Sequence, residues 1–155
     1  KRNYTALVCG HVNKEGEIDA PIGRSLKERR KMTVTNRASR EAQTMYRLTE
    51  RYRLYDLLDV SLRTGRTHQI RVHFTHIGHP VFGDSEYGGR EKWHKGIFAN
   101  EKMLAKKLLE IMPRQALHSR KIEFEHPVKG AKVVIETELP HDFQNLLKAL
   151  DKEGR

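Results

Sequence analysis

The stretch that decides how this chain folds reads LRTGRTHQIRVHF over residues 62–74 and continues as HIGHPVFGDSEYGG over residues 76–89. Apolar residues alternate with polar ones before Gly65, and after it they recur every three to four positions. This change of period predicts a strand, a glycine turn and an α-helix, with Thr67 as the N-cap and Gly78 near the end of the helix.

The periodicity of the remaining chain predicts mostly strands. Residues 4–9 carry apolar side chains on both faces, which indicates an interior strand, and alternation predicts hairpins over residues 42–62 and 122–139. Helical stripes occupy residues 104–111 and 143–150. Because strands outnumber helices and short turns join them, we expect an α+β fold, with a largely antiparallel or mixed sheet and flanking helices.

The composition favours a polyanionic partner. The 155 residues are enough for one domain, and 30 Lys and Arg against 20 Asp and Glu give a net charge of +10. Such an excess favours nucleic acid, although a ribosomal or merely soluble basic protein has the same composition.

The basic residues are densest within residues 21–40, where apolar residues are sparse. This pattern predicts an exposed loop or ragged strand that contacts the phosphates of a nucleic acid and positions it; a solvated charged loop is the alternative. The cluster consists of Arg24, Lys27, Arg29, Arg30 and Lys31.

The single cysteine and the hydropathy of the chain bear on its compartment. Cys9 has no second cysteine with which to form an internal disulfide, and no run of about 18 apolar residues occurs. We therefore expect a cytoplasmic protein that does not bind to a membrane.

Three segments resemble motifs of the RluA-type pseudouridine synthases, which isomerise uridine to pseudouridine within RNA. They are residues 62–73, residues 77–88 and the RQALH run at 114–118. The resemblance extends from Arg2 to the last predicted helix and implies the pseudouridine synthase catalytic fold. The family's Arg-Leu-Asp-x-x-Thr-Ser-Gly segment, which holds the nucleophilic Asp, does not occur here. We therefore expect residues 1–155 to be the C-terminal portion of a single catalytic domain.

The same resemblance assigns roles to three residues. Arg71 corresponds to the ion-pair partner of the nucleophilic Asp, a task that suits a guanidinium because it can bind both carboxylate oxygens. Tyr4 corresponds to the tyrosine that stacks on the target base and accepts the proton from its carbon 5, and Ile70 to the apolar residue beside that base. The alternatives are a surface arginine on a helix and a tyrosine of the core.

Three further residues of the motif are candidates for RNA contacts. Gly65 allows close approach of the backbone, and the start of the following helix offers amides to a phosphate, so we expect Arg66, His68 and Gln69 to meet RNA. The alternative is ordinary turn and cap geometry.

Neither a metal nor an organic cofactor is expected. The spacing of His73, His76 and His79 invites a metal-site interpretation, but no Cys pair or Glu-His box accompanies them, so we interpret them as structural. Asp84 is a poor substitute for the missing nucleophile, because the resemblance implies that the loop that contains it has a structural role.

The predicted function is therefore that of an RNA pseudouridine synthase. The DAPIGR segment at residues 19–24 and the basic cluster favour large-subunit ribosomal RNA over tRNA as the substrate. We expect residues 1–155 alone to be inactive, because the nucleophile is missing. The alternative function is that of a catalytically inert RNA-binding relative that retains the fold.

Overall fold

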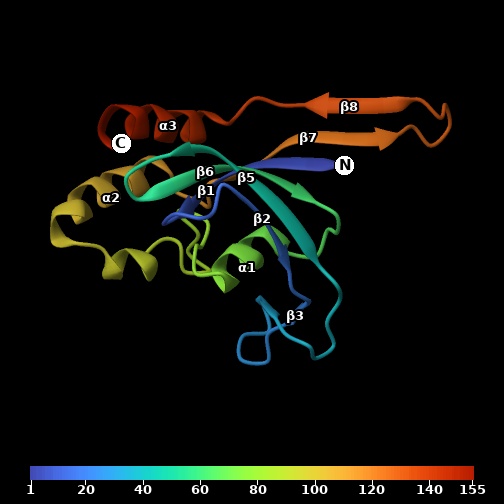
Figure 1. Cartoon of the computed structure of the whole chain (residues 1–155), viewed down its shortest axis with the longest axis horizontal. Coiled ribbons are helices and arrows are strands. Elements are labelled where there is room, and N and C mark those ends of the chain that lie inside the picture. Colours follow the sequence, from blue (N-terminus) through green and yellow to red (C-terminus); the bar gives the residue numbers. More distant parts are fainter.

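A six-stranded antiparallel sheet forms the centre of the molecule in the computed structural model, which describes residues 1–155 (Figure 1). Its strand order is β2-β5-β6-β1-β7-β8, and every neighbouring pair is antiparallel. The strands are β1 (Arg2–Cys9), β2 (Glu15–Asp19), β5 (Gln43–Arg51), β6 (Tyr55–Leu62), β7 (Leu117–Glu125) and β8 (Lys132–Glu136). The α+β class, the interior position of β1 and both predicted hairpins are confirmed.

Helices cover the two faces of this sheet. They are α1 (Gln69–His76), α2 (Ala99–Ile111) and α3 (His141–Glu153), together with a 3-10 helix, η1 (Trp93–Gly96). Because successive side chains of a strand point to opposite faces, Ala6 and Val8 of β1 pack on the α1 side, whereas Leu7 and Cys9 pack on the α2 and α3 side.

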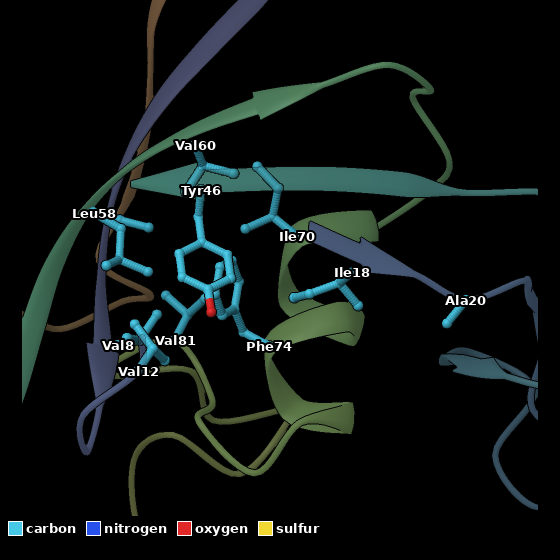
Figure 2. Close-up of a cluster of buried hydrophobic side chains, with 11 residues drawn as sticks. Val8, Val12, Ile18, Ala20, Tyr46, Leu58, Val60, Ile70, Phe74 and Val81 are labelled. Carbon is cyan, nitrogen blue, oxygen red and sulfur yellow. The ribbon is translucent and has the colours of Figure 1, made fainter. Parts of the chain in front are cut away.

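The core on the α1 side is a cluster of buried apolar side chains (Figure 2). Phe74 of α1 is fully buried and meets Tyr46 of β5 edge to face, with ring centroids 5.5 Å apart. Ile70, one turn earlier on α1, faces the same strands. These contacts fix α1, and with it the motif of residues 62–74, against the sheet.

A small two-stranded hairpin stands apart from the main sheet. It consists of β3 (Ile22–Arg24) and β4 (Met32–Val34), and it lies beyond α1 in Figure 1. The basic cluster lies on this hairpin and the loop between its strands. This agrees with the expected exposed loop or ragged strand.

The start of α1 differs from the prediction. The N-cap is His68 rather than Thr67, and its side chain makes no capping hydrogen bond. The carbonyl of His68 accepts the first helical bond from Val72, while the Gln69 side chain accepts the backbone N–H of Arg66 at 2.9 Å. The Gln69 amide thus stabilises the turn, and Thr67 is left exposed. The end of α1 agrees with the prediction, because Gly78 follows it at φ +84°.

None of these helices has the length and apolar character needed to span a bilayer.

Candidate active site

A cavity of about 340 Å³ opens where the turn between β6 and α1 meets β1 and the start of β7. Tyr4 and Arg71, which lie 67 positions apart in the sequence, both line it. The complete lining is Arg2, Tyr4, Leu62, Gly65, Arg66, His68, Gln69, Ile70, Arg71, Gln115 and Leu117. The fold therefore brings the first strand, the motif and the RQALH segment to one place.

Arg71 is the buried charge of this cavity. Its Nε and Nη2 donate to the two carboxylate oxygens of Asp84 at 2.7 and 2.8 Å, and Nη2 also donates to Glu86 at 3.1 Å. Every buried side-chain nitrogen and oxygen in the chain has a hydrogen-bond partner. Nη1 of Arg71 has no partner within the chain, so this atom is not buried and is open to solvent. One edge of the guanidinium is thus fixed and another remains available to an anion.

The environment of Arg71 keeps it charged. Burial alone lowers the pKa of its guanidinium, but the hydrogen bonds and negative charges of Asp84 and Glu86 outweigh that effect and raise the pKa above its usual value. The guanidinium also lies 4.7 Å from the centroid of the Tyr87 ring, in cation–π contact.

Asp84 serves as the anchor of Arg71. Its side chain is fully buried, and Oδ1 also accepts the backbone N–H groups of Glu86 and Tyr87 at 3.1 and 3.2 Å. A carboxylate held by a guanidinium fork and two amides is poorly placed to attack a substrate. This geometry agrees with the structural place expected for the loop.

Tyr4 lies on the wall of the cavity formed by β1. It is paired with Val60 of β6 and Ser119 of β7, and it is half-buried against the core on the α1 side. The Tyr4 hydroxyl makes no hydrogen bond within the chain. Because every buried polar side-chain atom has a partner, this hydroxyl is also open to solvent.

Ile70 and Gln69 belong mainly to the framework. Ile70 is 3% exposed and packs in the core, so only its edge reaches the cavity. Gln69 is 2% exposed, and its amide accepts from Thr64 and Arg66 and donates to Thr44 and the carbonyl of residue 43. Because all of these groups lie within the chain, Gln69 shapes the turn, and its amide has no free donor or acceptor to offer RNA.

The cationic side of the cavity comes from several segments. Arg66 is half-buried and donates from Nε to the carbonyl of Glu41 at 2.8 Å. Arg2 lies directly over Gly65, where its Nη1 is 2.6 Å from the position that a Cβ would take. Gly65 therefore makes room for a second guanidinium, a contact that the sequence pattern gave no means of predicting.

The basic cluster does not line this cavity. Four of its members are exposed, whereas Lys31 is half-buried and pairs with Glu28 at 2.9 Å. Lys27 and Lys31 instead line a neighbouring groove of about 560 Å³ between the β3–β4 hairpin and α1, which also contains Tyr87. Tyr87 had no role in the sequence-based prediction, although the GDSEYG run contains it.

Two of the three clustered histidines form hydrogen bonds with other parts of the chain, whereas His76 is exposed. His73 is fully buried between Thr44 and the carbonyl of Ala20, and His79 contacts the carbonyl of Cys9 at 2.9 Å. No group of three His, Cys, Asp or Glu side chains in residues 1–155 is arranged to hold a metal ion.

Comparison with solved structures establishes the class of fold. Human RNA pseudouridylate synthase domain containing 1 superposes with a TM-score of 0.67 at 24% identity, over 97% of this chain and 65% of that one. Human RNA pseudouridylate synthase domain containing 4 gives a TM-score of 0.73 at 20% identity, over 97% and 62%. The chain has the fold of pseudouridylate synthase domains.

Sequence comparison then identifies the family. The family model described as RNA pseudouridylate synthase matches residues 1–76. The ribosomal large subunit pseudouridine synthase D of Pseudomonas aeruginosa is 44% identical over 98% of this chain and 46% of its own length, and that of Xanthomonas campestris is 43% identical over 99% and 45%. The chain belongs to the RNA pseudouridine synthase family, and it spans about half the length of these relatives.

Proposed function

We propose that this chain forms part of the active site of an enzyme that isomerises uridine to pseudouridine in RNA, and that the substrate is large-subunit ribosomal RNA. The names of its relatives support both the reaction and the substrate. In this proposal residues 1–155 supply the C-terminal portion of the catalytic domain, and the nucleophilic Asp comes from a segment outside them.

The observation that carries the proposal is the meeting of Tyr4 and Arg71 in one cavity. Breaking a glycosidic bond and rejoining the base through carbon 5 requires a nucleophilic carboxylate, a cation that holds it ionised, and a surface on which the base can rest. The open Nη1 of Arg71 is suited to bind that carboxylate, and the Tyr4 ring can stack on the base. The Tyr4 oxygen can then accept the proton from carbon 5 while the hydroxyl passes its own proton to the solvent.

Arg71→Ala in the full-length protein tests this assignment. We expect pseudouridine formation in an RNA substrate to fall by about 100-fold or more, because the nucleophile loses its charge partner, while RNA affinity falls by less than about 10-fold. Arg71→Lys, which keeps the charge but not the fork, should also be strongly impaired. Pseudouridine yield, RNA affinity and thermal unfolding are measured on each variant.

Arg47→Ala is the matched control, because Arg47 is exposed on β5 and does not line the cavity. A folded Arg71→Ala variant that reacts at the wild-type rate would refute the assignment. A full-length wild-type protein that binds ribosomal RNA but forms no pseudouridine would instead favour an inert RNA-binding relative.

A further inference from the structure

Tyr87 connects the β3–β4 hairpin with two residues that line the cavity, His68 and Arg71. Its hydroxyl accepts the backbone N–H of Met32 in β4 at 3.0 Å and lies 2.7 Å from Nδ1 of His68. Its ring lies beneath the Arg71 guanidinium. Tyr87 therefore touches the basic hairpin, the turn before α1 and the buried charge of the site.

The backbone of Tyr87 is held as firmly as its side chain. Its N–H donates to Asp84 at 3.2 Å, and its carbonyl accepts the hydroxyl of Thr75 on α1 at 3.0 Å. The residue is 8% exposed. A side chain fixed at so many points can impose an orientation on the groups that it contacts.

The hydrogen bonds of the Tyr87 hydroxyl determine which nitrogen of His68 carries the proton. The amide of Met32 can only donate, so the phenolic oxygen accepts from it and keeps its own proton to give. The nearest acceptor for that proton is Nδ1 of His68. If Nδ1 were protonated instead, the Tyr87 hydroxyl proton would have no acceptor within the chain. This arrangement leaves neutral His68 with its proton on Nε2.

The Nε2–H group of His68 is available to a substrate. His68 lines the cavity, and its Nε2 has no hydrogen-bond partner within the chain. Because every buried side-chain nitrogen has a partner, Nε2 is open to solvent. His68 also holds φ at +55°, a conformation that costs free energy for any residue but glycine and persists only where its surroundings enforce it. Burial and the charge of Arg71 lower the pKa of His68, which favours the neutral ring.

We propose that Tyr87 is a positioning residue, whose hydroxyl fixes His68 as an Nε2–H donor toward the RNA in the cavity and couples that donor to the seating of the β3–β4 hairpin. This inference rests on the proposed function, because it takes RNA as the occupant of the cavity. The acceptor is an oxygen, either a base carbonyl or a phosphate of the bound nucleotides. The hairpin that carries the basic cluster is thereby tied to the donor by two hydrogen bonds through one hydroxyl.

Tyr87→Phe in the full-length protein is the test, since it removes both hydrogen bonds and keeps the ring over which Arg71 lies. With ¹⁵N-labelled histidine, the imidazole nitrogen shifts report the tautomer of His68, whose signals are assigned by their loss in His68→Gln. We expect the Nε2–H form in the wild-type protein and a mixture of both tautomers in Tyr87→Phe. We also expect KM for the RNA substrate to rise about three- to ten-fold, with a smaller change in kcat.

Tyr52→Phe is the matched control, because it removes a tyrosine hydrogen bond to Asp151 and Tyr52 lines neither the cavity nor the groove. If Tyr87 acts through His68, the double variant Tyr87→Phe/His68→Ala should be no more impaired than His68→Ala alone. An Nδ1–H tautomer in the wild-type protein, or an unchanged tautomer and KM in Tyr87→Phe, would overturn the inference. The tautomer is measured without any reaction. A failure of the proposed isomerase function, which the Arg71 experiment would show, can therefore be distinguished from a failure of the inference about Tyr87.

Discussion

At the scale of single residues, Arg71 depends on Asp84. The pair is almost completely buried, with the Arg71 side chain 9% exposed and that of Asp84 not exposed at all. Removing one member of a buried ion pair leaves the other charge without compensation, so Asp84→Ala should lower the free energy of unfolding by about 3 kcal/mol. Urea denaturation measures this change.

Glu153→Ala is a suitable comparison for Asp84→Ala. It removes a carboxylate from a solvent-exposed pair with Lys107, an interaction that water and salt screen, and it should leave the urea midpoint almost unchanged. Equal effects of the two substitutions would show that burial does not strengthen the dependence of Arg71 on Asp84.

Tyr4 allows binding and proton transfer to be separated at a single residue. Because Tyr4→Phe keeps the ring and removes the hydroxyl, we expect it to reduce kcat in the full-length enzyme by about 100-fold while RNA affinity is retained. Tyr4→Ala should weaken binding as well. Tyr46→Phe on β5 is the control, because Tyr46 packs in the same core but does not line the cavity. A fully active Tyr4→Phe variant would contradict the assigned proton transfer.

At the scale of elements, a hydrogen-bonded chain holds α1 and the preceding turn against β5. His73 of α1 lies 2.8 Å from the carbonyl of Ala20, an acceptor only, so Nε2 carries the proton and donates it. Nδ1 then accepts the hydroxyl of Thr44, whose oxygen accepts the Gln69 amide. A second proton on His73 would leave the Thr44 hydroxyl without an acceptor. The neutral ring is therefore part of the framework of the site.

This chain of hydrogen bonds predicts how stability depends on pH. Burial lowers the pKa of His73, and also those of His68 and His94, against a value of about 6.5 in an unfolded chain. As the pH falls below about 6.5, the unfolded state binds protons that the folded state does not, so the free energy of unfolding decreases. Urea unfolding at pH 7.5 and 5.5 measures the loss. In His73→Gln the dependence should be weaker, and stability that is constant or rises on acidification would contradict this account.

At the scale of the whole molecule, the chain carries a net charge of +10. The groove beside the cavity contains Lys27 and Lys31 and shares Tyr87 with the surroundings of Arg71. Because each neutralised phosphate releases counterions, RNA affinity should fall steeply with salt. Replacing Lys27, Arg29 and Arg30 by Gln should reduce the slope of log K against log salt concentration by about 0.7 for each lost contact.

Three lysines on α2 provide the matched control for this charge change. Lys102, Lys106 and Lys107 carry the same total charge, and they line neither the cavity nor the groove. Their replacement by Gln should change the salt slope less than replacement of the hairpin residues. Equal changes would indicate that net charge, rather than the hairpin, determines RNA binding.

The limits of sequence-based prediction follow from the range of the interactions involved. Strand alternation and helical stripes reflect burial of one face of a local element, so the hairpins and all three α-helices could be predicted from the spacing of apolar residues. The cap of α1 could not, because the Gln69 amide stabilises that turn through contacts with β5 as well as with its neighbours. A preference of Thr67 for the N-cap position is weaker than this set of hydrogen bonds.

The sequence by itself determined the class of fold, the excess of positive charge and, through its motifs, the resemblance to pseudouridine synthases. Only the tertiary structure decided that Tyr4 and Arg71 share a cavity, that Asp84 holds one edge of Arg71, and that Tyr87 joins the basic hairpin to His68. The physical reason is that these arrangements bring together residues distant in the sequence, such as Tyr4 and Arg71, which are 67 positions apart and line the same cavity. Their geometry depends on how α1 and the loop after it pack on the sheet, and no local period of the sequence records that packing.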